Sequence, residues 1–191
     1  MIGKSVFGKL GKRLSYGVLA ILLAGGTALA AEFSADMVSE GGGQPMMGKV
    51  FVKGEKIRQE FDQDGEKMVT ILRMDRKLTW ILMVDEKAYM EMKMKANAED
   101  PKLVEKADPA SVKRLGNETV NGFVCEKIQV TEKDAVITQW LSKELGWPLK
   151  GEVKGKEGTF THEYKNIKKG GVSDALFEIP AGFQKMSVPG M

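Results

Sequence analysis

Alternating methionines are the residues of this sequence with the clearest chemical potential. Met90, Met92 and Met94 follow a Met-x-Met-x-Met pattern, and Met46-Met47 adds two more thioethers. In a strand, residues two apart share one face and lie about 6 to 7 Å apart. Thioether sulfurs suit Cu(I), but they also form an apolar surface that adapts to variable ligands. Sulfurs on a straight strand do not converge on one ion, so we favour the apolar surface and keep a periplasmic Cu(I)-type site as the alternative.

Few other side chains offer catalytic or metal-binding chemistry. His162 is the only histidine and Cys125 the only cysteine, and the sequence has no Gly-x-Ser-x-Gly motif. One cysteine excludes an intrachain disulfide framework and a Cys-rich zinc site. Nucleophilic catalysis needs a nucleophile, a base and an orienting group together. We therefore predict a non-enzymatic protein without a cofactor or metal, in which His162 is a partly exposed strand residue. Cys125 is predicted to be a buried inert thiol, with an intermolecular disulfide as the alternative.

The N-terminus has the three parts of a secretory signal peptide. Residues 1–13 carry four positive charges and no acid, and an apolar run covers 18–24. A small-residue stretch then ends at Ala30, with Ala28 and Ala30 in the positions that signal peptidase requires. The uninterrupted apolar run is about half the roughly 20 residues that a membrane span needs. We predict cleavage after Ala30 and a periplasmic or secreted mature chain consisting of one domain, 31–191.

Removal of residues 1–30 changes the charge balance. It removes four positive charges and no negative ones, which leaves 25 Lys+Arg against 26 Asp+Glu, a net charge of −1. A near-neutral chain with interspersed signs lacks the basic footprint of a nucleic-acid-binding protein. We therefore exclude nucleic acid as a partner. An apolar ligand, an envelope protein and peripheral contact with a membrane remain as expected partners.

The mature sequence is dominated by short segments with period-two alternation of apolar and polar residues. Ala88 to Lys95, for example, has apolar residues on one face and mainly charged residues on the other. Turn pairs such as Asp64-Gly65 and Asn121-Gly122 separate these segments. The fold class we predict is mainly β with short helices: one curved antiparallel sheet of roughly nine to ten strands.

One region departs from the strand pattern. Asp100-Pro101 and Asp108-Pro109 each place a helix-capping residue before a proline, and Gly116 is a suitable helix end. The sequence therefore predicts two short helices, an insert near residues 100–116, that covers one face of the sheet.

The strand Leu78–Val84 is apolar on both faces, so each face needs a cover. We expect one face to be covered by the helical insert and the other to line a core or a cavity. The residues predicted to line an apolar cavity come from this strand and the next one: Trp80, Leu82, Met90, Met92 and Met94.

Several motifs of this chain resemble those of the bacterial lipoprotein carrier LolA and its superfamily. The resemblance covers most of residues 33–186 and is nearest to a secreted bacterial branch known only as a domain of unknown function. The segments that carry it are Lys53–Arg58, Asp75–Trp80, Gly146–Lys150, Glu163–Ile167 and Asp174–Phe183.

The resemblance implies an open half-barrel, closed on one side by helices, with an apolar cavity for acyl chains. Two departures from the LolA pattern matter. Phe33 opens a strand where the carriers begin with a helix, and the carriers' functional arginine has no clear counterpart, although Arg58 lies near its place. We therefore predict an exported binding or carrier-type protein that holds a lipid or an acylated protein. An envelope scaffold with no small ligand is a further alternative.

Overall fold

The computed structural model describes residues 31–41, 45–63, 65–94, 112–132, 135–156 and 158–186 of the 191-residue chain. Within these ranges the chain forms twelve strands and two short 3-10 helices. In chain order they are β1 (Glu32–Glu40), β2 (Met46–Lys53), β3 (Lys56–Gln63), β4 (Glu66–Arg73), η2 (Met74–Arg76), β5 (Leu78–Met83), β6 (Ala88–Lys93), β7 (Val112–Val120), β8 (Phe123–Glu132), β9 (Ala135–Ser142), β10 (Trp147–Gly155), β11 (Gly158–Lys169), η4 (Asp174–Phe177) and β12 (Gln184–Lys185).

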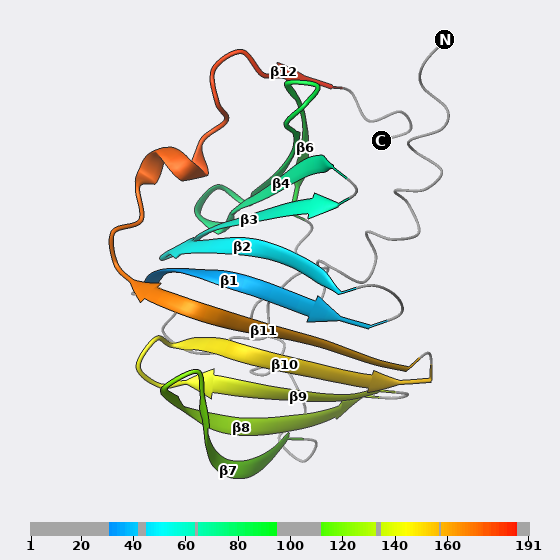
Figure 1. Ribbon diagram of the computed structural model, residues 1–191, viewed down its shortest axis with the longest axis vertical. Helices are drawn as coiled ribbons and strands as arrows, with labels where there is room; N and C mark the ends of the chain where they lie inside the picture. Colours follow the sequence, from blue (N-terminus) through cyan, green and yellow to red (C-terminus); the bar gives the residue numbers. More distant parts are fainter. Residues whose placement is uncertain are drawn as a thin grey trace.

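All these strands belong to one curved sheet with the order β12-β6-β5-β4-β3-β2-β1-β11-β10-β9-β8-β7 (Figure 1). Strands β1–β6 form one meander and β7–β11 form a second. The two meanders are joined by antiparallel pairing of β1 with β11. Only β12 runs parallel to its neighbour, β6. The predicted fold class, an open curved antiparallel sheet, is confirmed.

The strand register assigns the side chains of β1–β6 and β11 to two faces. Residues directly opposite each other in an antiparallel pair lie on the same face. We call the face that carries Phe33 and Met37 the inner face, and the other the outer face. The inner face comprises Phe33, Ala35, Met37, Ser39, Met46, Gly48, Val50, Val52, Ile57, Gln59, Phe61, Met68, Thr70, Leu72, Thr79, Ile81, Met83, Ala88, Met90, Met92, His162 and Tyr164.

The largest apolar cluster lies on the inner face, around the junction of the two meanders. Phe33, Trp147 and Tyr164 are buried there, and the Phe33 ring meets the other two edge-on with centroids 6.0 and 6.4 Å apart. Edge-to-face pairs add about 0.5–1.5 kcal/mol beyond the burial of their area. The joint between the meanders is therefore held by side-chain packing as well as by the β1–β11 hydrogen bonds.

The outer face of β4 and β5 is covered by the chain's own C-terminal segment. Residues 172–183, which we call the strap, include η4 and pack onto a second apolar cluster. Phe177 is fully buried at its centre. The strap continues into β12, which pairs with β6 at the edge of the sheet (Figure 1).

Two predictions about the elements need correction. The sheet has twelve strands among the described residues, not nine or ten, and the predicted helical insert is not seen. Residues 95–111 lie outside the described ranges, but 112–116 belong to β7. Gly116, with φ +96°, lies at an irregularity of the β7–β8 register and does not end a helix. The predicted tight turn at Asn121-Gly122 is confirmed, because both residues have positive φ and join β7 to β8.

Candidate functional site: the inner face of the curved sheet

The five predicted cavity residues do not share one face. Trp80 and Leu82 point to the outer face of β5, whereas Met90 and Met92 lie on the inner face of β6. Met94 follows the end of β6 and is half-buried. A cavity on the inner face could therefore be lined by the methionines of the predicted set but not by Trp80 or Leu82.

Trp80 and Leu82 are occupied by packing against the strap. Both are buried in the outer cluster with Phe177, and the Trp80 indole nitrogen donates to the Glu91 carboxylate at 3.0 Å. The Arg73 guanidinium lies 5.9 Å from the Trp80 ring centroid, within cation–π range. We expected this side of the strand, with Trp80 and Leu82, to line an apolar cavity. The structure covers it with the strap instead.

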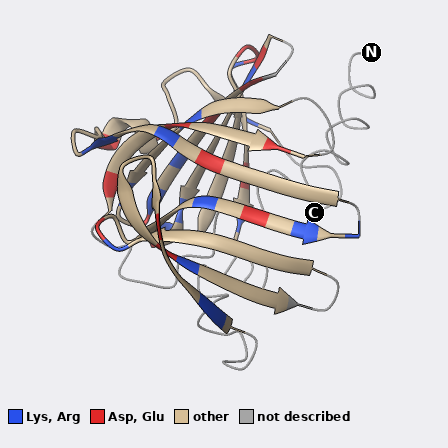
Figure 2. Cartoon of the chain, turned by 60° about the horizontal axis from the view of Figure 1, so that its bottom comes forward, with Lys and Arg blue, Asp and Glu red and all other residues tan. Residues whose placement is uncertain are grey.

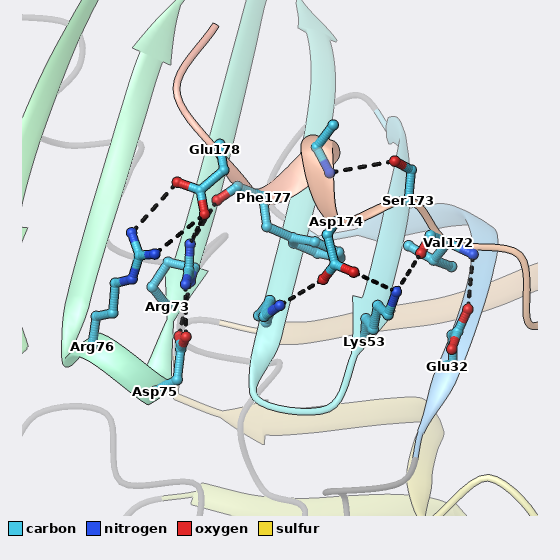
Figure 3. Close-up of polar contacts among 12 residues, drawn as sticks. Glu32, Lys53, Arg73, Asp75, Arg76, Val172, Ser173, Asp174, Phe177 and Glu178 are labelled. Atoms are coloured by element: carbon cyan, nitrogen blue, oxygen red, sulfur yellow. Dashed lines mark hydrogen bonds and ion pairs between the residues drawn. The ribbon is translucent and has the colours of Figure 1, made fainter.

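Polar contacts hold the strap along its length (Figure 3). The buried Arg73 side chain binds Asp75 through Nε and Nη2 at 2.8 and 2.7 Å, and it binds Glu178 through Nη1 at 2.6 Å. These carboxylates raise the pKa of Arg73, and Arg73 in turn lowers the pKa of Asp75. Farther along, Lys53 and Lys56 bind the two carboxylate oxygens of Asp174 at 2.8 and 2.6 Å.

Arg58, the residue nearest to the place of the carriers' functional arginine, also serves the strap. Its Nε donates to Glu60 at 2.6 Å, and its Nη1 donates to the carbonyl oxygen of Leu176 at 2.9 Å. The side chain lies on the outer face. Arg58 therefore fastens the C-terminal segment and does not face the inner surface.

The inner face carries a methionine surface, which we define as Met37, Met46, Met68, Met83, Met90 and Met92. Met68 and Met83 are direct cross-strand partners, and Met90 lies opposite Ile81. Met37 and Met90 are buried, and the other four are half-buried. The sequence pattern identified Met90 and Met92. The alternation of β4 and β5 contains the same signal for Met68 and Met83.

Buried polar side chains interrupt this apolar surface. His162, Gln59 and Gln139 are 2%, 1% and 5% exposed. Both ring nitrogens of His162 and the amide nitrogens of the two glutamines have no hydrogen-bond partner among the described residues. The prediction that His162 is partly exposed is wrong. Burial lowers the pKa of its imidazole to about 4, so the ring is neutral at pH 7.

Cys125 is fully buried, as predicted. Burial raises the pKa of the thiol to about 11, so the reactive thiolate is scarce at neutral pH. Within the described ranges, no group of three or more His, Cys, Asp or Glu side chains could hold a metal ion. In the same ranges no helix has the length and apolar character that crossing a bilayer requires.

Lys, Arg, Asp and Glu positions are interspersed along the strands (Figure 2). A groove of about 420 Å³ on the outer face shows the same mixture, because Lys49 and Lys168 share it with Asp36. Asn166 donates to the Asp36 carboxylate there at 2.8 Å. The groove therefore has no single charge that would select a ligand. The inner face remains the candidate site.

Comparisons with solved structures place this fold among known ones. An uncharacterized conserved protein from Thermus thermophilus is 14% identical, with a TM-score of 0.59 over 83% of this chain and 91% of that chain. MucB in the Pseudomonas aeruginosa MucA/MucB complex is 17% identical, with a TM-score of 0.57 over 87% of this chain. This chain spans 61% of that MucB chain. At such identities the likeness concerns the fold.

Two further comparisons concern a solved LolA superfamily protein and the curated proteins. A LolA superfamily protein from Nitrosomonas europaea is 10% identical and has a TM-score of 0.41 over 82% of this chain and 96% of that chain. A search of the curated proteins finds no match.

The resemblance to a domain of unknown function is confirmed, and the sheet has the open curved form that the sequence resemblance implied. The fold is an open curved antiparallel sheet, and a protein-family model matches residues 35–147, more than half of the chain. The chain belongs to the family described as "Domain of unknown function (DUF4412)".

Proposed function

We propose that this protein is an exported, non-enzymatic binding protein that holds an apolar ligand, a lipid or an acyl chain, against its inner face. One observation carries the proposal. The outer face of β4 and β5 is filled by the protein's own strap, whereas the inner face of β1–β6 presents the methionine surface. Methionine is flexible and polarizable, so such a surface adapts to chains of different shape.

The energetics favour an acyl chain as the ligand. Each buried methylene contributes about 0.8 kcal/mol before the costs of association are subtracted. Charged residues such as Lys49 and Lys93 lie on the outer face or at its rim. They would keep the protein soluble while the apolar surface points inward.

A displacement assay tests the proposal. Delipidated mature protein is titrated with a fluorescent fatty acid, and we expect saturable uptake. Met92→Lys places a charge on the methionine surface and should abolish uptake. Met47→Lys is the matched control. Met47 is 67% exposed on the outer face, so the same change there should leave uptake unchanged. Circular dichroism establishes that both variants fold.

Two results would count against apolar binding. One is the absence of uptake by delipidated wild type, and the other is equal uptake by the Met92→Lys and Met47→Lys variants. Native mass spectrometry of gently purified protein provides an independent measurement, since a bound lipid should appear as a mass that organic extraction removes.

Export is part of the proposal, because a periplasmic location supplies the envelope lipids and acylated proteins that such a surface would bind. Residues 1–30, including Ala28 and Ala30, lie outside the described ranges. N-terminal sequencing of protein from the envelope fraction should begin at Ala31 or Glu32. An intact Met1 terminus in the membrane fraction would refute cleavage.

The Cu(I) alternative rests on Met90 and Met92, which do share the inner face with other thioethers. Copper titration of the metal-free protein separates the two functions. We expect no tight stoichiometric binding. Submicromolar affinity that is lost in Met92→Leu would favour copper, because leucine keeps the volume and removes the sulfur.

A second candidate function is protein binding at the free edge of the sheet. β7 is the edge strand and is largely exposed, and Leu115 on it is 48% exposed. Val124, on the neighbouring strand β8, is 60% exposed. MucB, which has a similar fold, is solved in complex with MucA. A photo-crosslinking residue at position 115 should capture an envelope protein. The same residue placed at the exposed position 62 should not capture it. The trapped protein must then bind in purified form for this candidate to stand.

A further inference from the structure

A row of buried polar side chains crosses the inner face at one register position. Ser39 on β1 lies opposite His162 on β11, His162 lies opposite Gly151 on β10, and Gly151 lies opposite Gln139 on β9. Directly opposite residues share a face, so the three side chains line up on the inner surface. They are 6%, 2% and 5% exposed. We call these four residues the polar row.

Gly151 makes this arrangement possible. A Cβ atom at this position would lie 2.3 Å from His162 Cε1 and 2.8 Å from Nδ1, so the imidazole lies directly over the glycine backbone. Strands β11 and β9 are separated by two interstrand spacings, about 10 Å. By lying over Gly151, the His162 ring extends from its own strand toward Gln139.

The polar row has buried nitrogen atoms without hydrogen-bond partners, and one of the two nitrogens of the neutral His162 ring is an N–H donor. Nδ1 and Nε2 of His162 and Nε2 of Gln139 have no hydrogen-bond partner among the described residues. The large majority of buried side-chain polar atoms in proteins are hydrogen-bonded, and leaving one unpaired is costly. Three such atoms in one row indicate that a group outside the described residues supplies their hydrogen-bond partners.

The charge of the polar row restricts what that partner can be. The row itself contains no acid, lysine or arginine. The charged residues next to the row on its own strands alternate to the opposite face: Glu40, Lys150, Glu152 and Glu163. Tyr164, whose ring centroid lies 5.7 Å from that of His162, is fully buried, and burial raises the pKa of its phenol. A buried anion would find no cation here, whereas a neutral acceptor would find N–H donors.

We propose that the polar row binds an uncharged carbonyl oxygen, that of an ester or amide linking an acyl chain to its headgroup. His162 and Gln139 donate the hydrogen bonds, and Gly151 provides the space. This inference rests on the proposed function, since it assigns the polar end of the same ligand whose chain the methionine surface holds.

A matched pair of probes tests the inference. 1-Monopalmitoylglycerol and 1-O-hexadecylglycerol have the same headgroup and chain length, but only the first has an ester carbonyl. Displacement of a fluorescent fatty acid from wild type should give an affinity about tenfold higher for the ester, the equivalent of one satisfied buried hydrogen bond. His162→Phe and Gln139→Leu should remove this preference and leave the affinity for the ether nearly unchanged. Gln129→Leu, on the outer face of the neighbouring strand β8, is the matched control.

A spectroscopic measurement on wild type does not depend on folding of the variants. His162 is the only histidine of the chain, so the imidazole ¹⁵N signals of tag-free protein are unambiguous. The ester should shift the signal of the protonated nitrogen, and the ether should not.

The outcomes separate the two proposals. Equal affinity for ester and ether, with unchanged imidazole signals, would overturn the carbonyl site and leave apolar binding intact, with water as the partner of the polar row. Failure of wild type to bind either probe would overturn the proposed function, and the carbonyl site with it.

Discussion

The two faces of strands β4–β6 differ in how their apolar side chains are covered. On the outer face, Trp80, Leu82 and Ile71 are covered by the strap, whose polar groups are paired with Arg58, Arg73 and the two lysines. On the inner face, the same strands carry four methionines, of which Met90 is buried and the other three are half-buried: Met68, Met83 and Met92. The difference shows that a large apolar residue in a strand is weak evidence for a ligand site until its covering segment is known.

The outer face is closed by residues from distant parts of the sequence. Arg73 donates to the Phe177 carbonyl at 3.2 Å and to Glu178, so a residue of β4 fixes a segment more than 100 positions away. A charge that is buried with complete hydrogen bonding is costly to disturb, because removal of one partner leaves the other unpaired. The strap is therefore part of the folded core and not an appendage.

Phe177→Ala should have the largest effect on the molecule. The side chain is fully buried in the outer cluster, and truncation of such a phenylalanine costs about 3–5 kcal/mol. Chemical denaturation should report this loss in the free energy of unfolding. Met47→Ala, at an exposed methionine, is the control and should change the stability by less than about 0.5 kcal/mol.

This variant also tests whether the two faces are independent. Ester binding at the inner face should persist in folded Phe177→Ala protein. Loss of binding together with the strap would mean that the outer cluster shapes the inner surface, and that the contrast between the faces does not hold.

The inner face should make stability depend on pH through His162. Its pKa is lowered from 6.5 to about 4 by burial, so the unfolded chain binds a proton that the folded chain does not in this window. The contribution is fully present above pH 6.5 and is lost as the pH falls toward 4, by up to about 3 kcal/mol. Denaturation midpoints of wild type and His162→Gln should therefore converge between pH 7.5 and pH 4.5. Parallel pH profiles would contradict burial of a neutral imidazole.

Gly151→Ala should cost about 1–3 kcal/mol, the usual penalty of overpacking, because the new methyl group would meet the His162 ring. A double-mutant cycle identifies the cause. In a His162→Ala background the ring is absent, and the same glycine substitution should become much less costly. An unchanged cost in that background would show that the glycine is required for its backbone and not for the ring.

How much of this could be predicted from the sequence depends on the range of the interactions. The alternation of Ala88–Lys93 placed Met90 and Met92 on one face correctly, because that is a property of the strand itself. The helix predicted to end at Gly116 was wrong, because pairing of Val112 with Val130 extends the Asn121-Gly122 hairpin over the capping signal. The cover over the face of β5 that carries Trp80 comes from residues 172–183. The burial of His162 depends on Gly151 in another strand. Neither is visible in local spacing.

The smallest effect is expected for Asp174→Asn, at the exposed end of the strap. Its carboxylate binds Lys53 and Lys56, and these partners lower the pKa of Asp174 to about 2. The stabilisation is therefore present above pH 3.8 and is lost as the pH falls through about 2. The carboxylate is 62% exposed, so water and salt screen the pair and the contribution is small.

Salt distinguishes this ionic contact from the apolar closure around Phe177. At low ionic strength the Asp174→Asn variant should melt slightly below wild type, and in 1 M NaCl the difference should vanish, since the Debye length falls to about 3 Å. The loss caused by Phe177→Ala should persist at both salt concentrations, because apolar burial is not screened. A large, salt-independent effect of Asp174→Asn would mean that the ion pairs, and not the buried phenylalanine, close the outer face.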